Sequence, residues 1–294
     1  MNHATFKIGD LTAVIGNNAA HDSHRAGYNG MWSLRHKDAQ RDLFAPGLTG
    51  LNLEHIFSGV HEDEDSKVFF EPRNAPMTFK KISDSVAELY QPPTPTHHLE
   101  SWTRFELVAP HYIDMTFRCR ATQHVFDYDY IGLFWASYIN AAEDKSLYFR
   151  GGMESHADTW SQFCTQAHDD ESTLRHRDDN FALSFSAIQR NTLYRNHSPM
   201  RFDQHFYYGH FDELVWLMMF KPPQHGHIRF AHSPSGGGLN NKRQTTNCAW
   251  DFQYIVPDYE VMVDYTFSAR AALRKKCSRE EILNEFNTWN KTFK

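Results

Sequence analysis

The sequence lacks the features that mark several large classes of protein. Its 294 residues include only four cysteines, and no two of them have the C-x-x-C spacing typical of zinc ribbons and redox pairs. No run of about 18 apolar residues is present, so no transmembrane helix is expected. Residues 1–16 have neither the basic start nor the long apolar middle of a secretion signal. These absences favour a cytoplasmic protein with free thiols.

An excess of positive charge is also missing. Lys and Arg number 30 against 36 Asp and Glu, which gives a formal net charge of -6. Such a chain is not generally attracted to nucleic acid or to an anionic membrane, so neither is an expected partner. The glycines at 236–238 lack the Gly-x-x-x-x-Gly-Lys-Ser/Thr spacing of a P-loop. We find no internal repeat of fixed period and no low-complexity tract.

Aromatic side chains and histidine are abundant. The chain has 23 Phe, 13 Tyr and 7 Trp, together 15% of its residues, and 19 His. Aromatic residues favour strands and also supply rings for binding surfaces. Short runs with strand character recur along most of the chain, with turn residues about every ten positions. This pattern predicts an all-β fold, a large antiparallel β-sandwich of the supersandwich or jelly-roll type, with residues 1–294 forming one domain.

The clearest strand pattern lies between residues 99 and 140. Apolar or small side chains alternate with polar ones over 99–107, and the alternation resumes over 113–120 after a turn at 109–111 that contains proline. Period two on both sides of such a turn is typical of a hairpin. Residues 130–140 are apolar on both faces, which indicates a central strand. We expect three consecutive strands of one antiparallel sheet here.

Other segments complete the expected topology. The polar stretch 141–180 has little regular pattern and is a candidate lid or cleft wall. Ser278 and Glu281 form a capping box that begins a C-terminal helix over 278–293, in which Trp289 faces the core. Further strands are expected at 11–15, 31–36, 51–58, 68–71, 77–82, 86–90, 147–150, 181–188, 206–210, 214–220, 228–231, 250–256 and 259–273.

Glu54 and His55 place a carboxylate and an imidazole side by side in the strand-like run 51–58. Successive residues of a strand point to opposite faces of the sheet. The two side chains can therefore join one site only if a β-bulge intervenes.

The polar face of the hairpin has two interpretations. Trp102 stacks well on the C–H face of a sugar ring, while Arg104 and Glu100 suit its hydroxyls or a carboxylate, so this face is a candidate floor of a sugar-binding groove. The same residue types also suit an exposed sheet with cross-strand ion pairs.

Three parts of the sequence carry a resemblance in strand pattern and residue types. They are N-L-E-H-I-F-S-G at 52–59, H-H-L-E-S-W-T-R-F-E-L at 97–107, and S-P-S-G-G-G at 233–238 with N-C-A-W-D-F at 247–252. Together they resemble the galactose-mutarotase-like supersandwich and related jelly-roll folds of carbohydrate-active proteins. The resemblance implies an enzyme that acts on a glycoside or a uronic-acid-containing saccharide, as hydrolase, lyase or epimerase.

Such chemistry requires an acid and a base with opposite protonation states, for which His with Glu or Tyr is suited. A lyase also needs Arg or a metal to neutralise the substrate carboxylate. No cofactor is implied, and no metal ligand is assigned. The candidate catalytic residues are Glu100, His98, His232 and Asp251, and the candidate substrate-binding residues are Trp102, Arg104, Arg118, Tyr138, His210 and Trp250.

Two other functions are compatible with the same residues. The aromatic side chains also suit a sugar-binding module without catalysis. The histidines instead suggest a metal-dependent enzyme of the cupin type, although the expected His-x-His with a downstream Glu and His is met only in part by His225-Gly226-His227. The cluster His21, Asp22 and His24 has no third ligand at a fixed spacing.

Overall fold

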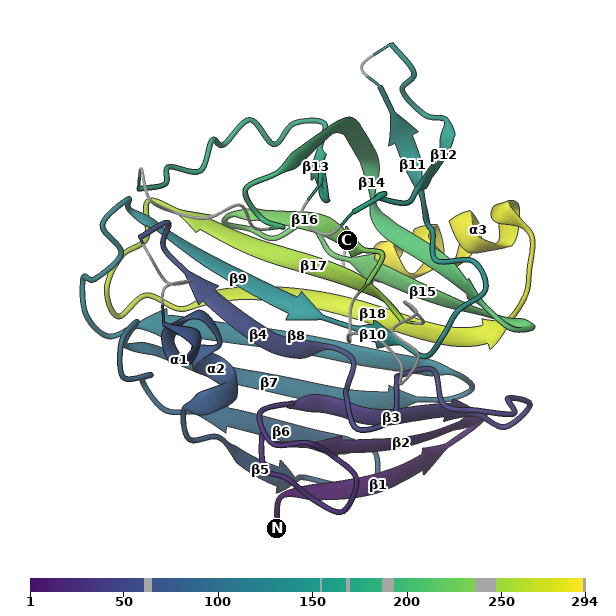
Figure 1. The fold of residues 1–294 in the computed structure, drawn as a ribbon. Coiled ribbons are helices and arrows are strands. Elements are labelled where there is room, and N and C mark those ends of the chain that lie inside the picture. The colour runs from purple at the N-terminus through teal and green to yellow at the C-terminus, as the bar shows by residue number, and fades with distance from the viewer. Residues whose placement is uncertain (61–64, 154, 168–169, 187–192, 236–246, 293–294) are drawn as a thin grey trace.

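A computed structural model describes residues 1–60, 65–153, 155–167, 170–186, 193–235 and 247–292. Strands dominate it and form two sheets (Figure 1). The smaller sheet has the order β1-β2-β3, with β1 (His3–Ile8), β2 (Leu11–Gly16) and β3 (Gly30–His36).

The larger sheet folds over so that its two halves face each other, and we call these halves the first and the second layer. The first layer has the order β4 (Asn52–Phe57), β9 (Tyr130–Ala136), β17 (Cys248–Pro257), β16 (His227–Ser233), β13 (Thr173–His176), β14 (His197–Phe211) and β15 (Leu214–Phe220). The second layer continues with β18 (Tyr265–Lys275), β8 (Tyr112–Ala121), β7 (Leu99–Val108), β6 (Val86–Gln91) and β5 (Thr78–Lys81). Three short strands join the first layer, namely β10 (Tyr138–Ile139), β11 (Leu147–Gly152) and β12 (Trp160–Phe163).

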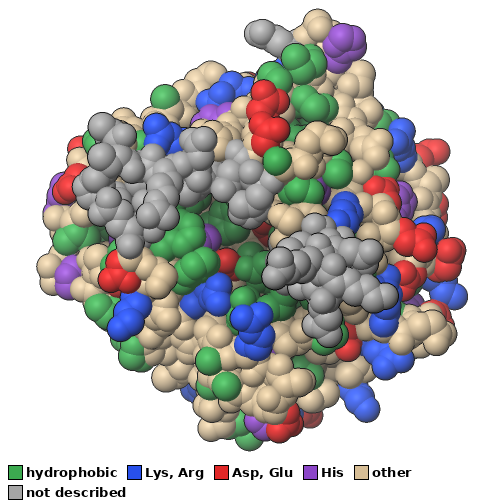
Figure 2. All heavy atoms as spheres, in the orientation of Figure 1, with side chains coloured by type: hydrophobic (Ala, Val, Ile, Leu, Met, Phe, Trp, Pro, Cys, Tyr) green, Lys and Arg blue, Asp and Glu red, His purple; other side chains and the backbone are tan. Residues whose placement is uncertain are grey.

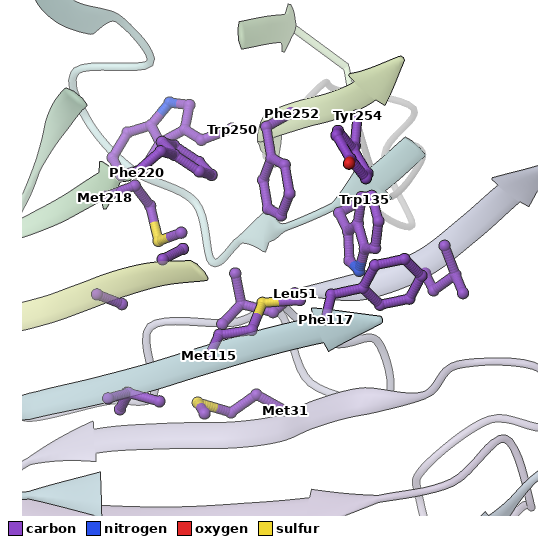
Figure 3. Packing of buried hydrophobic residues seen from close by; sticks show 14 of the residues in the cluster. Met31, Leu51, Met115, Phe117, Trp135, Met218, Phe220, Trp250, Phe252 and Tyr254 are labelled. Carbon is purple, nitrogen blue, oxygen red and sulfur yellow. The ribbon is translucent and has the colours of Figure 1, made fainter. Parts of the chain in front are cut away.

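The main hydrophobic core lies between the two layers. Phe252 and Tyr254 on β17 point towards Met115 and Phe117 on β8 (Figure 3). Trp135 on β9 meets the Phe117 ring edge-on at a centroid distance of 4.7 Å. The inward residues of both layers are therefore packed apolar side chains, and the polar residues of each strand lie on its outer face.

The hairpin predicted at residues 99–120 is confirmed. β7 and β8 pair from Leu99 opposite Ala121 to Val108 opposite Tyr112, and their alternate residues are buried. β9 is buried along its whole length, as its apolar pattern predicts. It is not the neighbour of β8, however, because it pairs with β4 and β17 in the opposite layer. A strand that is apolar on both faces needs cover on both, and the crossover supplies it.

Three segments differ from the expected secondary structure. Residues 68–71 form no strand but span the end of a short helix, α1 (Ser66–Phe69), a turn at Phe70, and the start of a second, α2 (Glu71–Asn74). Asp65 caps the first helix and a proline opens the second. Residues 181–186 form no strand, and 187–188 lie outside the described residues. Within 259–273 the strand begins only at Tyr265, after Met262 adopts a φ of 66°.

Two further differences concern the first half and the middle of the chain. The strand β1 was not expected, because its side chains are mostly half-buried and do not alternate clearly between apolar and polar. Within the stretch 141–180 the strand expected at 147–150 is present as β11, and two strands that were not expected, β12 and β13, pair with β11 and with β14 and β16.

The C-terminal helix α3 (Arg279–Lys291) is confirmed, together with its capping box. Its buried residues Ile282, Phe286 and Trp289 pack on Phe206 of β14 and Val215 of β15. This helix covers the outer face of the first layer at β14 and β15. The outer face over β4, β9, β17, β16 and β13 carries a separate cluster of aromatic and small residues.

Candidate functional site

The outer face of the first layer holds most of the buried charged residues of the described chain. Figure 2 shows a hollow over β4, β9 and β17, with hydrophobic side chains on its floor and acidic, basic and histidine side chains around it. Tyr28, Phe134 and Tyr138 belong to the aromatic cluster on this face. We call this region the outer-face site.

A β-bulge brings Glu54 and His55 to the same face. The pairing of β4 with β9 shifts between Leu53 and His55, so Glu54 is the extra residue of the bulge. As a result, Glu54 Oε1 lies 3.6 Å from His55 Nε2. The β-bulge that these two residues need in order to share one site is therefore present.

Hydrogen-bond donors surround the Glu54 carboxyl group. The Tyr138 hydroxyl donates to Oε2 at 2.5 Å, and Asn52 Nδ2 donates to the same atom at 2.9 Å. Arg73 Nη1 lies 3.6 Å from Oε1. Because Glu54 is only 6% exposed, these donors replace the water that an exposed carboxylate would bind. Burial and the neighbouring Glu54 raise the pKa of Tyr138 well above its ordinary value.

Asp251 supplies a second carboxyl group on this face. It lies on β17 directly beside Ala231 of β16, and its Oδ1 accepts a hydrogen bond from the backbone N–H of Ser137 at 2.9 Å. Burial raises the pKa of Asp251 well above its ordinary value, and the charge of Glu54 acts in the same direction. A carboxyl group with a raised pKa and a second one that accepts several hydrogen bonds are a combination suited to acid–base chemistry.

Arg73 links Glu54 to the helical insertion between β4 and β5. Its guanidinium lies over the Tyr28 ring at 4.0 Å, and its Nε donates to the Gly27 carbonyl at 3.1 Å. Arg73 also lines a pocket of about 540 Å³ together with Phe70 and Asn18. The insertion therefore fixes a cation at the edge of the outer-face site.

Glu71 anchors the short helix that carries Arg73. Its carboxylate accepts hydrogen bonds from the backbone N–H groups of Thr96 and His97 and forms an ion pair with the His97 ring. Burial alone would raise the pKa of Glu71, but the His97 interactions and these backbone bonds outweigh it and lower the pKa to about 2. The ionised carboxylate is therefore a structural element of the folded state.

This pKa predicts a loss of stability in acid. A carboxyl group with a pKa lowered from 4.5 to about 2 on folding stabilises the protein fully above pH 4.5. The contribution, about 3 kcal/mol, is lost as the pH falls through that window towards 2. Urea midpoints measured across it should fall steeply for the wild type and less steeply for Glu71→Gln. Equal slopes for the two proteins would contradict the assignment.

A second buried cluster lies on the same face, where β16 runs directly beside the strand of Asp251. Arg229 of β16 binds Asp179 through both ends of its guanidinium, with Nε to Oδ2 at 2.6 Å and Nη2 to Oδ1 at 3.0 Å. Neither side chain is exposed. Arg229 Nη1 also lies 3.4 Å from Nε2 of His197, whose pKa is lowered to about 4 by burial and by the nearby arginines. His197 therefore accepts from Arg229 as a neutral ring.

Of the ten candidate residues from the sequence, the structure brings Tyr138 and Asp251 to the outer-face site. Trp250 and His232 lie close by in sequence and space but face the interior. Trp250 belongs to the main core, and its Nε1 donates to the Lys145 carbonyl at 2.8 Å. His232 Nε2 lies 2.8 Å from the same carbonyl, and its Nδ1 lies 2.9 Å from Thr165 Oγ1. Burial lowers the pKa of His232 to about 4, so the ring is a neutral bridge between two loops.

The hairpin candidates lie on the outer face of the second layer, away from Glu54. Glu100 accepts from the Tyr90 hydroxyl at 2.7 Å and from Arg120. Arg118 stacks on the Trp102 ring at 3.8 Å and pairs with an aspartate of the neighbouring segment. Arg104 is exposed, with Glu106 at 3.6 Å. This is the ion-paired sheet face that was the alternative to a groove floor, and neither of the two described pockets is lined by these residues.

The two remaining candidates lie elsewhere. His98 is at the turn before β7, where its carbonyl accepts from the backbone and the hydroxyl of Thr122. His210 faces the side of the sheet that α3 covers, beside the rings of Tyr148 and Tyr208. It lines a pocket of about 600 Å³ with four carboxylates and Lys276. Neither histidine is near Glu54.

The histidines considered for a metal site have other contacts. His227 Nδ1 lies 3.7 Å from Asp179, and His24 stacks on Trp32 at 3.9 Å. Within the described part of the chain, no three His, Cys, Asp or Glu side chains converge in the way that holds a metal ion. The glycine run at 236–238 lies outside the described residues.

Sequence reasoning missed Arg73, Asp179 and Arg229 as parts of a site. Each is a single charged residue without a local motif, and its role depends on a partner at least 19 residues away, such as Asp179 for Arg229, 50 residues away. Glu54 and His55 did carry a signal, because adjacent ionisable residues in an apolar strand are unusual.

Solved structures with this architecture were found by comparison of folds. The chain is similar to the GalM/aldose epimerase homologue from C. elegans, with a TM-score of 0.52 and 8% sequence identity over 94% of this chain and 100% of that one. It is also similar to a galactose mutarotase-like protein from Lactobacillus casei, with a TM-score of 0.50 and 8% identity over 92% and 100%. The Slr1438 protein from Synechocystis gives 0.51 and 7% over 93% and 96%.

These similarities define the fold. It is a galactose-mutarotase-like β-sandwich, and both the expected fold class and the resemblance found in the sequence are confirmed. No family model matches the chain, and no curated protein matches its sequence. None of the helices in the described segments is both long and apolar enough to cross a membrane.

Proposed function

We propose that this protein is a carbohydrate-active enzyme that works by proton transfer at the outer-face site. Glu54 acts as the proton acceptor, Asp251 as the proton donor, and Tyr138 relays or positions the proton at Glu54. Arg73 and His55 orient the Glu54 carboxylate. The single observation that carries the proposal is the pair of buried carboxyl groups on one sheet face, one surrounded by donors and the other with a raised pKa.

The fold supports saccharides as the substrate class. Structures of similar fold bear the names aldose epimerase homologue and galactose mutarotase-like protein. The outer-face site combines aromatic rings with carboxyl and guanidinium groups, which suits a ligand with apolar C–H faces and many hydroxyls. Epimerisation or mutarotation is therefore the first reaction to test, and hydrolysis or elimination at a uronate the next.

The test is an assay of the purified protein against a panel of aldoses, oligosaccharides and oligouronates. Anomeric exchange is followed by NMR, bond cleavage by new reducing ends, and elimination by the absorbance of unsaturated sugars. Turnover of one saccharide class by the wild type supports the proposal. Saturable binding without turnover would instead identify a sugar-binding module, and the absence of both would overturn the proposal.

Tyr138→Phe is expected to lower kcat on that saccharide by about tenfold or more, because it removes the hydroxyl that shares a proton with Glu54. Loss of this buried hydrogen bond also costs about 1–3 kcal/mol of stability, which urea unfolding measures separately. Tyr90→Phe is the matched control, since it removes a tyrosine–glutamate bond of 2.7 Å on the second layer. Equal kcat losses in both variants would contradict a catalytic role for Tyr138.

A further inference from the structure

Three arginines occupy neighbouring strands on the outer face, next to the proposed catalytic groups. Arg175 of β13 is the Cα partner of Arg201 on β14. On its other side β13 pairs with β16, with Leu174 opposite Phe230, which places Arg175 next to Arg229. Leu174, Phe202 and Phe230 all belong to the main core, so the three arginines point the other way.

The described part of this cluster contains more positive than negative charge. Asp179 is the carboxylate that acts on Arg175, and both of its oxygens are already bound by Arg229. Among the residues that the structure describes, the Arg201 guanidinium donates only to the backbone carbonyls of His176 and Asp179. Two guanidinium groups, those of Arg175 and Arg201, therefore have no carboxylate partner among the described residues.

Arg175 is the least satisfied member of the cluster. Its Nε is buried and lacks a hydrogen-bond partner, and within the described chain no hydrogen bond or ion pair is formed by its guanidinium. Burial, together with the charges of Arg201 and Arg229, lowers the pKa of Arg175 from its ordinary value. Arginine nevertheless stays charged in proteins, so a half-buried guanidinium without an anion is costly.

An unsatisfied amide oxygen lies on the strand next to Arg229. Gln253 of β17 is the Cα partner of Arg229 and has no exposed surface. Its Nε2 donates to Thr173 Oγ1 at 2.8 Å, whereas its Oε1 has no hydrogen-bond donor in the described residues. An acceptor of this kind suits a hydroxyl group. The cluster therefore combines two guanidinium groups that lack a carboxylate partner among the described residues with one unsatisfied amide oxygen.

We propose that Arg175 and Arg201 form an anion-binding subsite for a carboxylate or sulfate substituent of a saccharide, with Gln253 accepting from a neighbouring hydroxyl. The proposal rests on the proposed function, because it places the subsite in the same binding surface. The planar guanidinium binds both kinds of anion through two parallel hydrogen bonds. β13 lies two strands from β17, or about 10 Å from Asp251 at about 4.8 Å per strand. The anion is therefore carried by a sugar unit next to the reacting one.

The test compares matched saccharides that differ only in charge. Calorimetric titration of the wild type with an oligouronate, a sulfated oligosaccharide and their uncharged counterpart measures the preference, and inorganic sulfate alone measures the anion without the sugar. The charged ligands are expected to bind more tightly, and the better of the two identifies the substituent. This preference should weaken as salt is added.

Arg175→Gln is expected to weaken binding of the preferred charged ligand by about 10–100-fold and to leave the uncharged counterpart unaffected. Arg175→Lys keeps the charge without the fork and should give an intermediate affinity. Arg35→Gln, which replaces an exposed arginine on β3, is the matched control and should change neither affinity. Because the Arg175 guanidinium has no hydrogen-bond or ion-pair partner among the described residues, Arg175→Gln should not lower the urea midpoint.

Two outcomes separate this inference from the proposed function. If neutral sugars are turned over and charged ones show no advantage, the subsite is wrong while the catalytic proposal stands. If a charged saccharide binds through Arg175 but no substrate is turned over, the subsite stands and the catalytic proposal fails. Equal loss of the charged and uncharged ligands in Arg175→Gln, or a lowered urea midpoint, would assign Arg175 a structural role instead.

Discussion

Glu54→Gln is expected to lower kcat/KM for the saccharide substrate by about 10²–10⁴-fold, the usual contribution of a positioned acid or base. The amide keeps the shape of the side chain and can still accept from Tyr138 and Asn52 through its oxygen, but it takes up no proton. The folded state should therefore survive the change, which a urea midpoint close to that of the wild type would verify. The loss should appear in kcat more than in KM.

Glu100→Gln is the matched comparison, because it makes the same change in a partly buried tyrosine–glutamate pair on the second layer. Glu100 receives hydrogen bonds from Tyr90 and Arg120 on the second layer, so we expect kcat/KM to be unchanged. If Glu100→Gln abolished activity while Glu54→Gln did not, the reaction would lie on the hairpin face that the sequence pattern suggested. The pair of variants thus decides between the two faces of the molecule.

Arg229→Met is expected to lower the free energy of unfolding by about 3–5 kcal/mol, because it leaves the Asp179 carboxylate buried without its partner. Arg229 also donates to the Phe181 carbonyl at 2.7 Å, which adds to the loss. Asp179→Leu combined with Arg229→Met removes both charges and should recover much of this stability. Urea unfolding of the two single variants and the double variant gives the coupling free energy.

Arg118→Met provides the control for burial. Arg118 Nη1 lies 2.8 Å from the Asp264 carboxylate, a distance similar to that in the Arg229 pair. The side chains of Arg118 and Asp264 are, however, each about two-fifths exposed. Solvent screening should limit its loss to less than about 1 kcal/mol. Equal losses for Arg118→Met and Arg229→Met would show that burial does not set the strength of the Arg229 pair.

Local patterns predicted the features of the fold that depend on neighbouring residues. The alternation over 99–120 gave the hairpin and its buried face, and the apolar run from 130 gave a central strand. The Ser278–Glu281 pair gave the start of the last helix. Each feature depends on a period or a cap that spans only a few residues, so no distant contact was needed to infer it.

Pairing between distant strands decided the candidate site. The sequence placed Glu54 and His55 next to each other, but only the register of β4 against β9 turns both to the outer face. Asp251 and Tyr138 were candidate functional residues from the sequence, but Glu54 was not among those candidates. In the structure the Glu54 carboxylate accepts a hydrogen bond from Tyr138, and its charge helps to raise the pKa of Asp251. From the sequence, the polar face of the hairpin suited the floor of a sugar-binding groove as well as an exposed sheet with ion pairs. The strand order places this face on the outside of the second layer, on a different layer from Glu54.

The sequence by itself therefore determined an antiparallel β-sandwich with a capped terminal helix, because alternation and capping are local. Only the tertiary structure decided which of two similar polar faces carries the hollow, and which charged side chains on that face are paired with each other. The physical reason is that burial and charge pairing depend on residues far apart in the chain, such as Asp179 with Arg229 and Glu54 with Tyr138. These contacts exist only after the sheet has folded over its core.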